Sequence, residues 1–131
     1  MIGFDFDGVI SKVQRPKFLP NWFLNFSLFF FRWILLFSPE KKEVTEIMKK
    51  MSQKCDIVVI SCRPKFCENI TRKWLVKKGV PFSEIYCIGL GNSKTSLLKE
   101  KSVCLFIDDE KYHIEEAVSG GFDAVIIEDF V

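Results

Sequence analysis

The chain alternates short apolar runs with longer segments in which apolar residues recur every three or four positions. A continuous apolar run is typical of a strand buried on both faces, whereas the three-to-four spacing is typical of an amphipathic helix. The runs that predict strands lie at residues 1–6, 56–60, 85–88, 103–107 and 124–127. Because helical segments separate them, we expect an α/β fold, a Rossmann-like three-layer sandwich around a parallel five-stranded sheet.

Helix signals occupy the intervals between these runs. The pair Ser38-Pro39 marks the start of one helix, and Gly79 marks the end of the next. The predicted helices are 40–53, with Val44, Ile47, Met48 and Met51 on one face; 65–78; one that begins at Asn92 or Ser93; and one that follows Asp109 and ends at Ser119.

Polar residues follow three of the predicted strands directly. Asp5 and Asp7 end the first, Ser61 ends the second, and Asp108-Asp109 end the fourth. One intervening residue places Asp5 and Asp7 on the same side of an extended backbone, and Gly8 allows a sharp turn after them. Parallel sheets bind ligands beyond the carboxyl ends of their strands, so we expect these side chains to meet there. Paired carboxylates favour Mg²⁺, which completes its coordination with water and substrate phosphate.

Length and composition indicate the number of domains, the kinds of binding partner and the redox state of the cysteines. A chain of 131 residues predicts one domain, 1–131. A net charge of +2 with scattered basic residues gives no reason to expect a nucleic-acid partner. The cysteines are odd in number and lack C-x-x-C spacing, so we expect reduced thiols and a cytoplasmic protein; they are Cys55, Cys62, Cys67, Cys87 and Cys104. No secretory leader is expected, because cleavage would remove Asp5 and Asp7.

In their order along the chain, these residues resemble the four motifs of the haloacid dehalogenase superfamily of phosphohydrolases. The first motif is Asp5-Phe-Asp-Gly-Val-Ile10, the second is Ile57–Ser61, the third is Lys94, and the fourth is Phe106-Ile-Asp-Asp109. The segment Gly120-Gly-Phe-Asp-Ala124 is also similar to the family's usual ending. A receiver domain places its Lys after a phosphoacceptor in mid-chain, whereas here Lys94 precedes the last acidic pair, so that alternative is disfavoured.

The resemblance implies a role for each motif residue. Asp5 would attack phosphorus and form an aspartyl-phosphate, while Asp7 would act as general acid and then as general base. Lys94 would neutralise phosphoryl charge and pair with Asp5. The implied substrate-binding residues are Ser61, the backbone N–H of Cys62, Arg63 and Gly8, and the implied Mg²⁺ ligands are Asp5, the Asp7 carbonyl, Asp108 and Asp109.

Three residues that follow the second and fourth motifs have roles for which alternatives stay open. Arg63 either reaches a substrate phosphate or carboxylate, or faces solvent before Pro64. Cys62 lies beside the phosphate loop, where oxidation of its thiol is conceivable. His113 is expected to be an exposed residue of the helix after Asp109, not a catalytic base.

Residues 13–38 depart from the family's core and predict a small hydrophobic helical insert after the first strand, serving as a minimal cap or an association surface. Within it, residues 18–37 hold seven of the 14 phenylalanines. A single membrane span is disfavoured, because it would separate Asp5 from Ser61 and would carry Arg32 inside the bilayer. An almost wholly apolar helix still needs burial, so we expect a homo-oligomer through 18–37; membrane-surface contact and packing on the monomer's own core stay open. Whether Arg32 contributes to specificity also stays open.

Two functional hypotheses follow. The first is a Mg²⁺-dependent phosphomonoester hydrolase acting on a small phosphorylated metabolite through an aspartyl-phosphate. The second is a catalytically silent phosphate-binding or scaffold protein of the same fold, associated in one variant with a membrane surface. The presence of every motif residue favours the enzyme.

Overall fold

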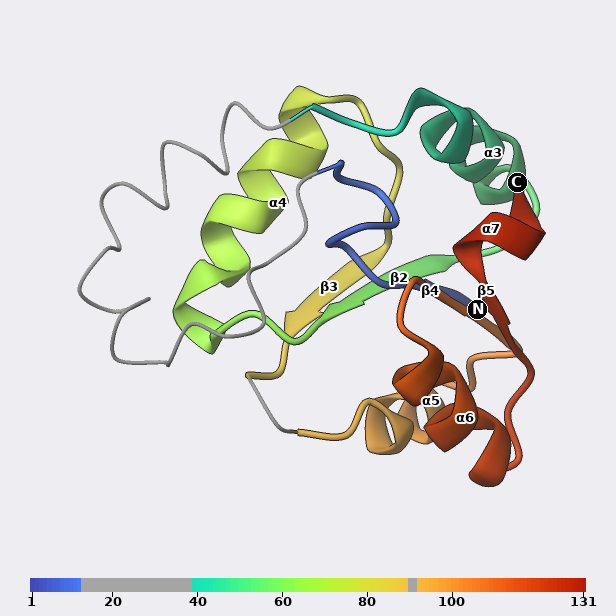
Figure 1. Ribbon diagram of the computed structural model, residues 1–131. Helices are drawn as coiled ribbons and strands as arrows, with labels where there is room; N and C mark the ends of the chain where they lie inside the picture. The colour runs from blue at the N-terminus through green and yellow to red at the C-terminus, as the bar shows by residue number, and fades with distance from the viewer. Residues whose placement is uncertain (13–38, 90–91) are drawn as a thin grey trace.

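The computed structural model describes residues 1–12, 39–89 and 92–131, and it confirms the predicted α/β fold (Figure 1). The strands form an all-parallel five-stranded sheet in the order β3-β2-β1-β4-β5. They are β1 (Ile2–Phe4), β2 (Ile57–Ser61), β3 (Glu84–Cys87), β4 (Leu105–Asp108) and β5 (Ala124–Ile126). Helices in the described ranges are α3 (Lys42–Ser52), the 3-10 helix η1 (Lys65–Cys67), α4 (Glu68–Lys77), α5 (Thr95–Glu100), α6 (Lys111–Ser119) and α7 (Ile127–Phe130).

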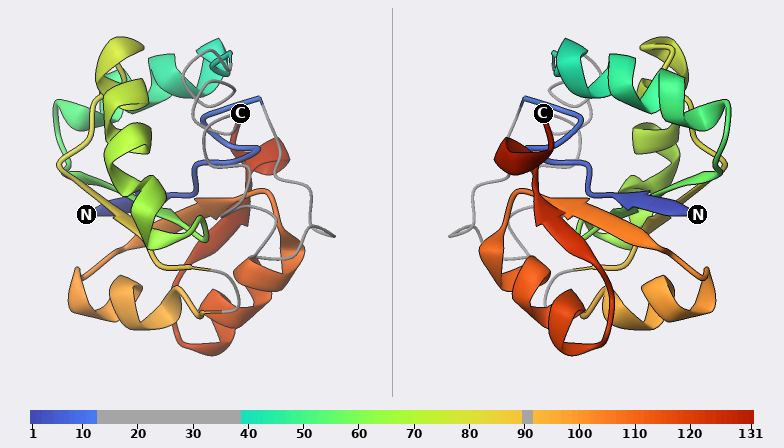
Figure 2. Two further views of the ribbon diagram at one scale, coloured as in Figure 1. Left: turned by 90° about the vertical axis from the view of Figure 1, so that its left-hand side faces the viewer. Right: turned by 90° about the vertical axis from the view of Figure 1, so that its right-hand side faces the viewer.

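Helices cover both faces of the sheet, and the central strands β1, β2 and β4 are buried on two sides as their continuous apolar runs predict, whereas the edge strands β3 and β5 are only partly buried. On one face the core joins the sheet to Met48 of α3, Trp74 of α4 and Ile127 of α7. On the opposite face a second cluster joins β2 and β4 to Leu98 of α5 and Ala117 of α6. Figure 2 shows these helix layers above and below the sheet. The three-layer sandwich is therefore confirmed for the described part of the chain.

The order of the strands decides where a site can form. The chain builds outward from β1 through β2 to β3, then returns to the other side of β1 for β4 and β5. Phe4 is therefore in register with Val59 of β2 on one side and Ile107 of β4 on the other. The carboxyl ends of β1, β2 and β4 lie side by side at this reversal, where α/β sheets bind their ligands.

The first strand is shorter than predicted, because the chain turns immediately after it. The carbonyl oxygen of Phe6 accepts hydrogen bonds from the backbone N–H groups of Ile10 and Ser11, both at 3.0 Å. Gly8 has a φ of 78°, which glycine adopts without strain. The predicted turn at Gly8 is present, and it begins early enough to take Asp5 and Asp7 out of the strand.

Several helix boundaries differ from the predicted ones. Helix α3 begins at Lys42, two residues later than predicted, and α5 begins at Thr95 instead of at Asn92 or Ser93. The helix predicted over 65–78 is divided into η1 and α4. There, Pro64 has an extended backbone (ψ 147°), and its carbonyl accepts a 2.9 Å hydrogen bond from the N–H of Cys67 in a tighter turn. The short α7 was not predicted, because the apolar run of β5 continues directly into it.

The insert predicted over 13–38, with its proposed association surface at 18–37, lies outside the described residues, and these expectations stay predictions. In the described ranges, no helix combines the length and apolar character that crossing a bilayer requires.

Candidate active site

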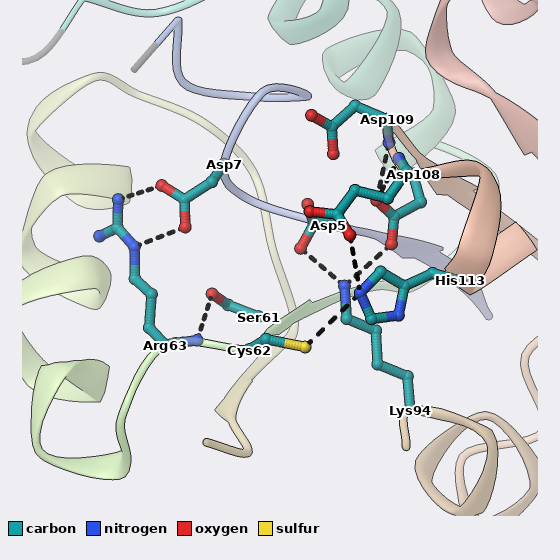
Figure 3. A network of polar contacts seen from close by, with 10 residues as sticks. Asp5, Asp7, Ser61, Cys62, Arg63, Lys94, Asp108, Asp109 and His113 are labelled. Atoms are coloured by element: carbon teal, nitrogen blue, oxygen red, sulfur yellow. Dashed lines mark hydrogen bonds and ion pairs between the residues drawn. The ribbon is translucent and has the colours of Figure 1, made fainter. Parts of the chain in front are cut away.

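The predicted site residues at the strand ends do come together in space. Asp5 follows β1, and its backbone N–H donates a 2.9 Å hydrogen bond to the carbonyl of Ile107 in β4. Ser61 is the last residue of β2, and Asp108 is the last residue of β4. Figure 3 shows these side chains around one point at the edge of the sheet. The parallel arrangement thus assembles residues that are far apart in sequence.

Lys94 lies between two carboxylates and is almost fully buried. Its Nζ donates to Asp5 Oδ1 at 2.7 Å and to Asp108 Oδ2 at 2.9 Å, and its side chain is 4% exposed. Burial would lower the pKa of Lys94, but the two carboxylates outweigh it and raise that pKa above its ordinary value. Lys94 therefore stays charged at the centre of the site. A lysine directly before a helix is ordinarily solvated, and the contact with two strand-end carboxylates explains why this one is not.

Three carboxylates form a cluster that suits a cation. One oxygen each from Asp5, Asp108 and Asp109 lies within 4.8 Å of the others. Asp108 Oδ1 also accepts hydrogen bonds from the backbone N–H groups of Asp109 at 2.7 Å and Glu110 at 3.1 Å, which fixes the orientation of this carboxylate. An all-oxygen set of carboxylates, two of them buried and the third partly buried, is chemistry that Mg²⁺ accepts. The cluster is consistent with the predicted metal site.

Burial and mutual repulsion perturb the acids of this cluster unequally. Burial raises the pKa of Asp5 well above its usual value, and the charges of Asp108 and Asp7 add to the effect while Lys94 opposes it. Burial together with Asp108 raises the pKa of Asp109 to about 7. Burial also acts on Asp108, but the Lys94 charge and the hydrogen bonds lower the pKa of that carboxyl. A cation beside these oxygens would favour their ionised forms.

Asp7 faces a different partner. Its carboxylate accepts two hydrogen bonds from the Arg63 guanidinium, one of them from Nε to Oδ2 at 2.8 Å and the other from Nη2 to Oδ1. Asp5 and Asp7 do not lie on one extended strand as expected, because the turn after β1 begins at Phe6, and Asp7 faces Arg63 whereas Asp5 faces Lys94 (Figure 3). A role of the Asp7 carbonyl as a metal ligand stays a prediction.

One of the two alternatives considered for Arg63, the solvent-facing one, is wrong, while substrate binding by Arg63 stays a prediction. Its side chain is 1% exposed, so it does not face solvent, and its guanidinium is engaged with Asp7 inside the protein. The sequence contains no local signal for this pairing, because the two residues are 56 positions apart.

The remaining predicted substrate-binding residues lie around the same edge. Ser61 is fully buried, and its Oγ accepts a 3.1 Å hydrogen bond from the N–H of Arg63. Cys62 Sγ lies 3.9 Å from His113 Nε2, and burial raises the pKa of this thiol to about 11. The carbonyl of Gly8 accepts a hydrogen bond from Lys41 Nζ, so a second lysine, missed by the sequence analysis, contacts the loop after β1. Phosphate binding by Ser61, Cys62 and Gly8 stays a prediction.

His113 is not the exposed residue that was expected. Its side chain is 15% exposed, and its Nε2 lies 3.5 Å from Glu110 Oε2 as well as close to Cys62. The sequence could have indicated that His113 lies near the acidic residues. His113 follows Asp109 by four positions, residues at that spacing share one face of a helix, and α6 begins just beyond the end of β4. His113 and Glu110 therefore border the acidic cluster.

Comparisons with known proteins find a distant relative and structures that share the fold. No protein-family model matches the chain. A nucleotidase of Clostridium acetobutylicum is 24% identical over 90 residues, which cover 69% of this chain and 46% of the relative. The chain thus spans less than half the length of that relative. The similarity is distant.

Solved structures with the same fold include chains of two Pnkp1/Rnl/Hen1 assemblies, one of them titled an RNA repair complex. The match to the RNA repair complex has a TM-score of 0.72 at 14% identity and covers 95% of this chain and 41% of the other. The second has a TM-score of 0.71 at 13% identity and covers 96% and 44%. At these identities the likeness concerns the fold alone.

Proposed function

We propose that this protein is a Mg²⁺-dependent phosphomonoester hydrolase of the haloacid dehalogenase superfamily that acts through an aspartyl-phosphate on Asp5. The observation that carries the proposal is the buried Lys94, which bridges Asp5 and Asp108 beside Asp109. A purely structural ion pair needs one carboxylate, whereas this lysine holds two at the ligand-binding edge of the sheet and leaves a third close by. The distant similarity to a nucleotidase supports the same reaction class.

Asp5 is positioned to act as the nucleophile. Lys94 holds Oδ1, so in this proposal Oδ2 forms the bond to phosphorus while the bond from phosphorus to the leaving oxygen breaks. Asp7 supplies a proton to that oxygen, and in the second step it takes a proton from the water that cleaves the aspartyl-phosphate. Inorganic phosphate is then released and both carboxyl groups return to their starting states.

Charge compensation comes from the groups around Asp5. Lys94 is a fixed positive charge that faces the transferring phosphoryl group, and the Ser61 hydroxyl has a proton to donate to a phosphoryl oxygen. Asp5, Asp108 and Asp109 would hold Mg²⁺. When bound, the ion supplies a counter-charge that allows an anionic nucleophile and an anionic phosphate to approach.

The test is release of inorganic phosphate by purified protein from 4-nitrophenyl phosphate and from a panel of phosphorylated metabolites. Because the relative is a nucleotidase, nucleoside monophosphates belong in the panel. We expect turnover with Mg²⁺ and none after chelation with EDTA. Folded protein that is inert with Mg²⁺ across the panel would contradict the proposed enzyme and favour the phosphate-binding scaffold.

Metal binding should depend on pH. Asp109 has its pKa raised to about 7, so in the metal-free protein this carboxyl is protonated below that pH and a bound cation must displace the proton. We expect Mg²⁺ affinity to fall by up to about tenfold per unit as pH drops below 7, and to level off above it. Titration of the thermal midpoint with Mg²⁺ at pH 5.5 and pH 8.0 measures the effect.

The same carboxyl should affect stability without metal. A carboxyl with a raised folded-state pKa disfavours folding as pH rises above its unfolded value, and the penalty is complete above about pH 7. Asp109→Asn removes this penalty, so in EDTA we expect the variant to gain stability relative to wild type between pH 5 and pH 8. The exposed Asp123, which precedes β5, provides the control Asp123→Asn. Equal pH profiles for Asp109→Asn and wild type would contradict the assignment.

A further inference from the structure

The Arg63 side chain is held by contacts from two segments of the chain, the loop after β1 and helix α4. Its guanidinium carbon lies 4.3 Å from the centroid of the Phe6 ring, in the loop after β1. Nη1 donates a 3.3 Å hydrogen bond to Thr71 Oγ1 of α4. The Thr71 hydroxyl in turn donates to the carbonyl of Cys67 at 2.8 Å, so its oxygen is oriented as an acceptor for Arg63.

The backbone of Arg63 is fixed as well. Its N–H donates to Ser61 Oγ at 3.1 Å, and its carbonyl accepts a 2.9 Å hydrogen bond from the N–H of Gly89 after β3. The backbone of Arg63 is therefore fixed by Ser61 and Gly89, and its guanidinium is fixed by Thr71 of α4. A side chain fixed at both ends has little freedom to change its position when a ligand binds.

The guanidinium of Arg63 binds the carboxylate of Asp7 through two N–H groups. Nε and Nη2 donate in parallel to the two oxygens of Asp7, an arrangement that defines the plane and direction of the carboxylate as well as its distance. Phe6, which stacks on the guanidinium, is the residue between Asp5 and Asp7, so the same contact also orders the loop that carries both.

We propose that Arg63 is a positioning residue that sets the orientation of Asp7 for proton transfer, and not a ligand of the substrate phosphate. The inference rests on the proposed function, since it assigns a task to the acid and base of that reaction. It replaces the expectation that Arg63 binds substrate. At least three guanidinium N–H donors are directed at Asp7 and Thr71, and the side chain is 1% exposed. An arginine that binds an anion from solution would instead have accessible N–H donors directed at the solvent.

The test uses the identity of the leaving group. 4-Nitrophenolate is a weak base and leaves without a proton, whereas an alkoxide, such as the 5′-oxygen of a nucleoside monophosphate, needs one. Because Asp7 also serves the second step, which all substrates share, the leaving-group effect is read from the first step alone, as the single-turnover rate of leaving-group release. For Arg63→Gln we expect this rate to fall about 10²-fold on the best alkyl phosphate of the panel and less than tenfold on 4-nitrophenyl phosphate, with the substrate Kd changed less than threefold on both. Asp7→Asn should show the same selectivity, and adding Arg63→Gln to Asp7→Asn should cost little more.

Two further variants separate positioning from general damage. Arg63→Lys retains the charge but cannot bond both oxygens of Asp7, so we expect the same selective loss on alkyl phosphates. Thr71→Val removes only the support of Nη1 and should give a smaller loss of the same kind. Thermal midpoints measured alongside show whether each variant is folded; if Arg63→Gln is not, Arg63→Lys carries the test.

The outcomes distinguish this inference from the function on which it rests. A rise in the substrate Kd, or equal losses of the single-turnover rate on aryl and alkyl phosphates in folded Arg63 variants of an active enzyme, would overturn the positioning role and leave the phosphatase intact. Wild-type protein inert on every substrate would overturn the proposed function and the positioning role together.

Discussion

Asp5→Asn is expected to abolish phosphatase turnover, with kcat reduced by at least about 10³-fold, because an amide cannot form the bond to phosphorus. The same substitution should be mild for stability. Burial already raises the pKa of Asp5 and so disfavours its charged form, and Asn keeps an oxygen that can accept from Lys94. Phosphate release with Mg²⁺, measured beside the thermal midpoint, separates loss of chemistry from loss of fold.

Asp123→Asn is the matched control for that measurement. Asp123 is exposed and precedes β5, at the opposite end of a strand from the acidic cluster, so its change to Asn should leave both turnover and stability near wild type. Asp5→Asn protein that releases phosphate as fast as wild type would contradict the nucleophile assignment. Unfolded Asp5→Asn protein would instead show that this carboxylate is needed for the structure.

Lys94→Met is expected to have the largest effect on stability as well as to remove activity. Methionine fills a similar volume but leaves Asp5 and Asp108 buried without their shared cation. Breaking a buried ion pair from one side typically costs about 3–5 kcal/mol. The loss should be greater at pH 8 than at pH 5, because at the lower pH the two carboxyl groups can take up protons. Urea unfolding at both pH values measures it.

Lys111→Met provides the comparison for Lys94→Met. Lys111 lies on the surface of α6, where its ion pair with Glu115 is 3.9 Å long and both side chains are mostly exposed, so its loss should change stability by no more than about 0.5 kcal/mol. Adding Asp5→Asn to Lys94→Met should recover part of the lost stability, since it removes one of the two unpaired carboxylates. A Lys94→Met protein as stable as wild type at pH 8 would contradict the central place of this lysine.

The fold and much of the candidate site could be predicted because their signals are local. The strands were predicted from continuous apolar runs, and the position of Ser61 and Asp108 followed from where two of those runs stop. The sheet order then brings both residues beside Asp5 without further information. Boundaries were less accurate at α3 and α5, where no side-chain cap marks the start of the helix.

The amino-acid sequence by itself determined which carboxylates stand at the ends of β1 and β4. A buried strand ends where its apolar run stops, and the first polar residues after the two runs are these aspartates. Only the tertiary structure decided which cation Asp7 faces, whereas the pairing of Lys94 with Asp5 was already implied by the family resemblance. Lys94 reaches Asp5 across 89 positions and Arg63 reaches Asp7 across 56, so these pairings depend on how the strands pack and on the turn at Gly8. That turn directs two aspartates, with one residue between them, to different partners.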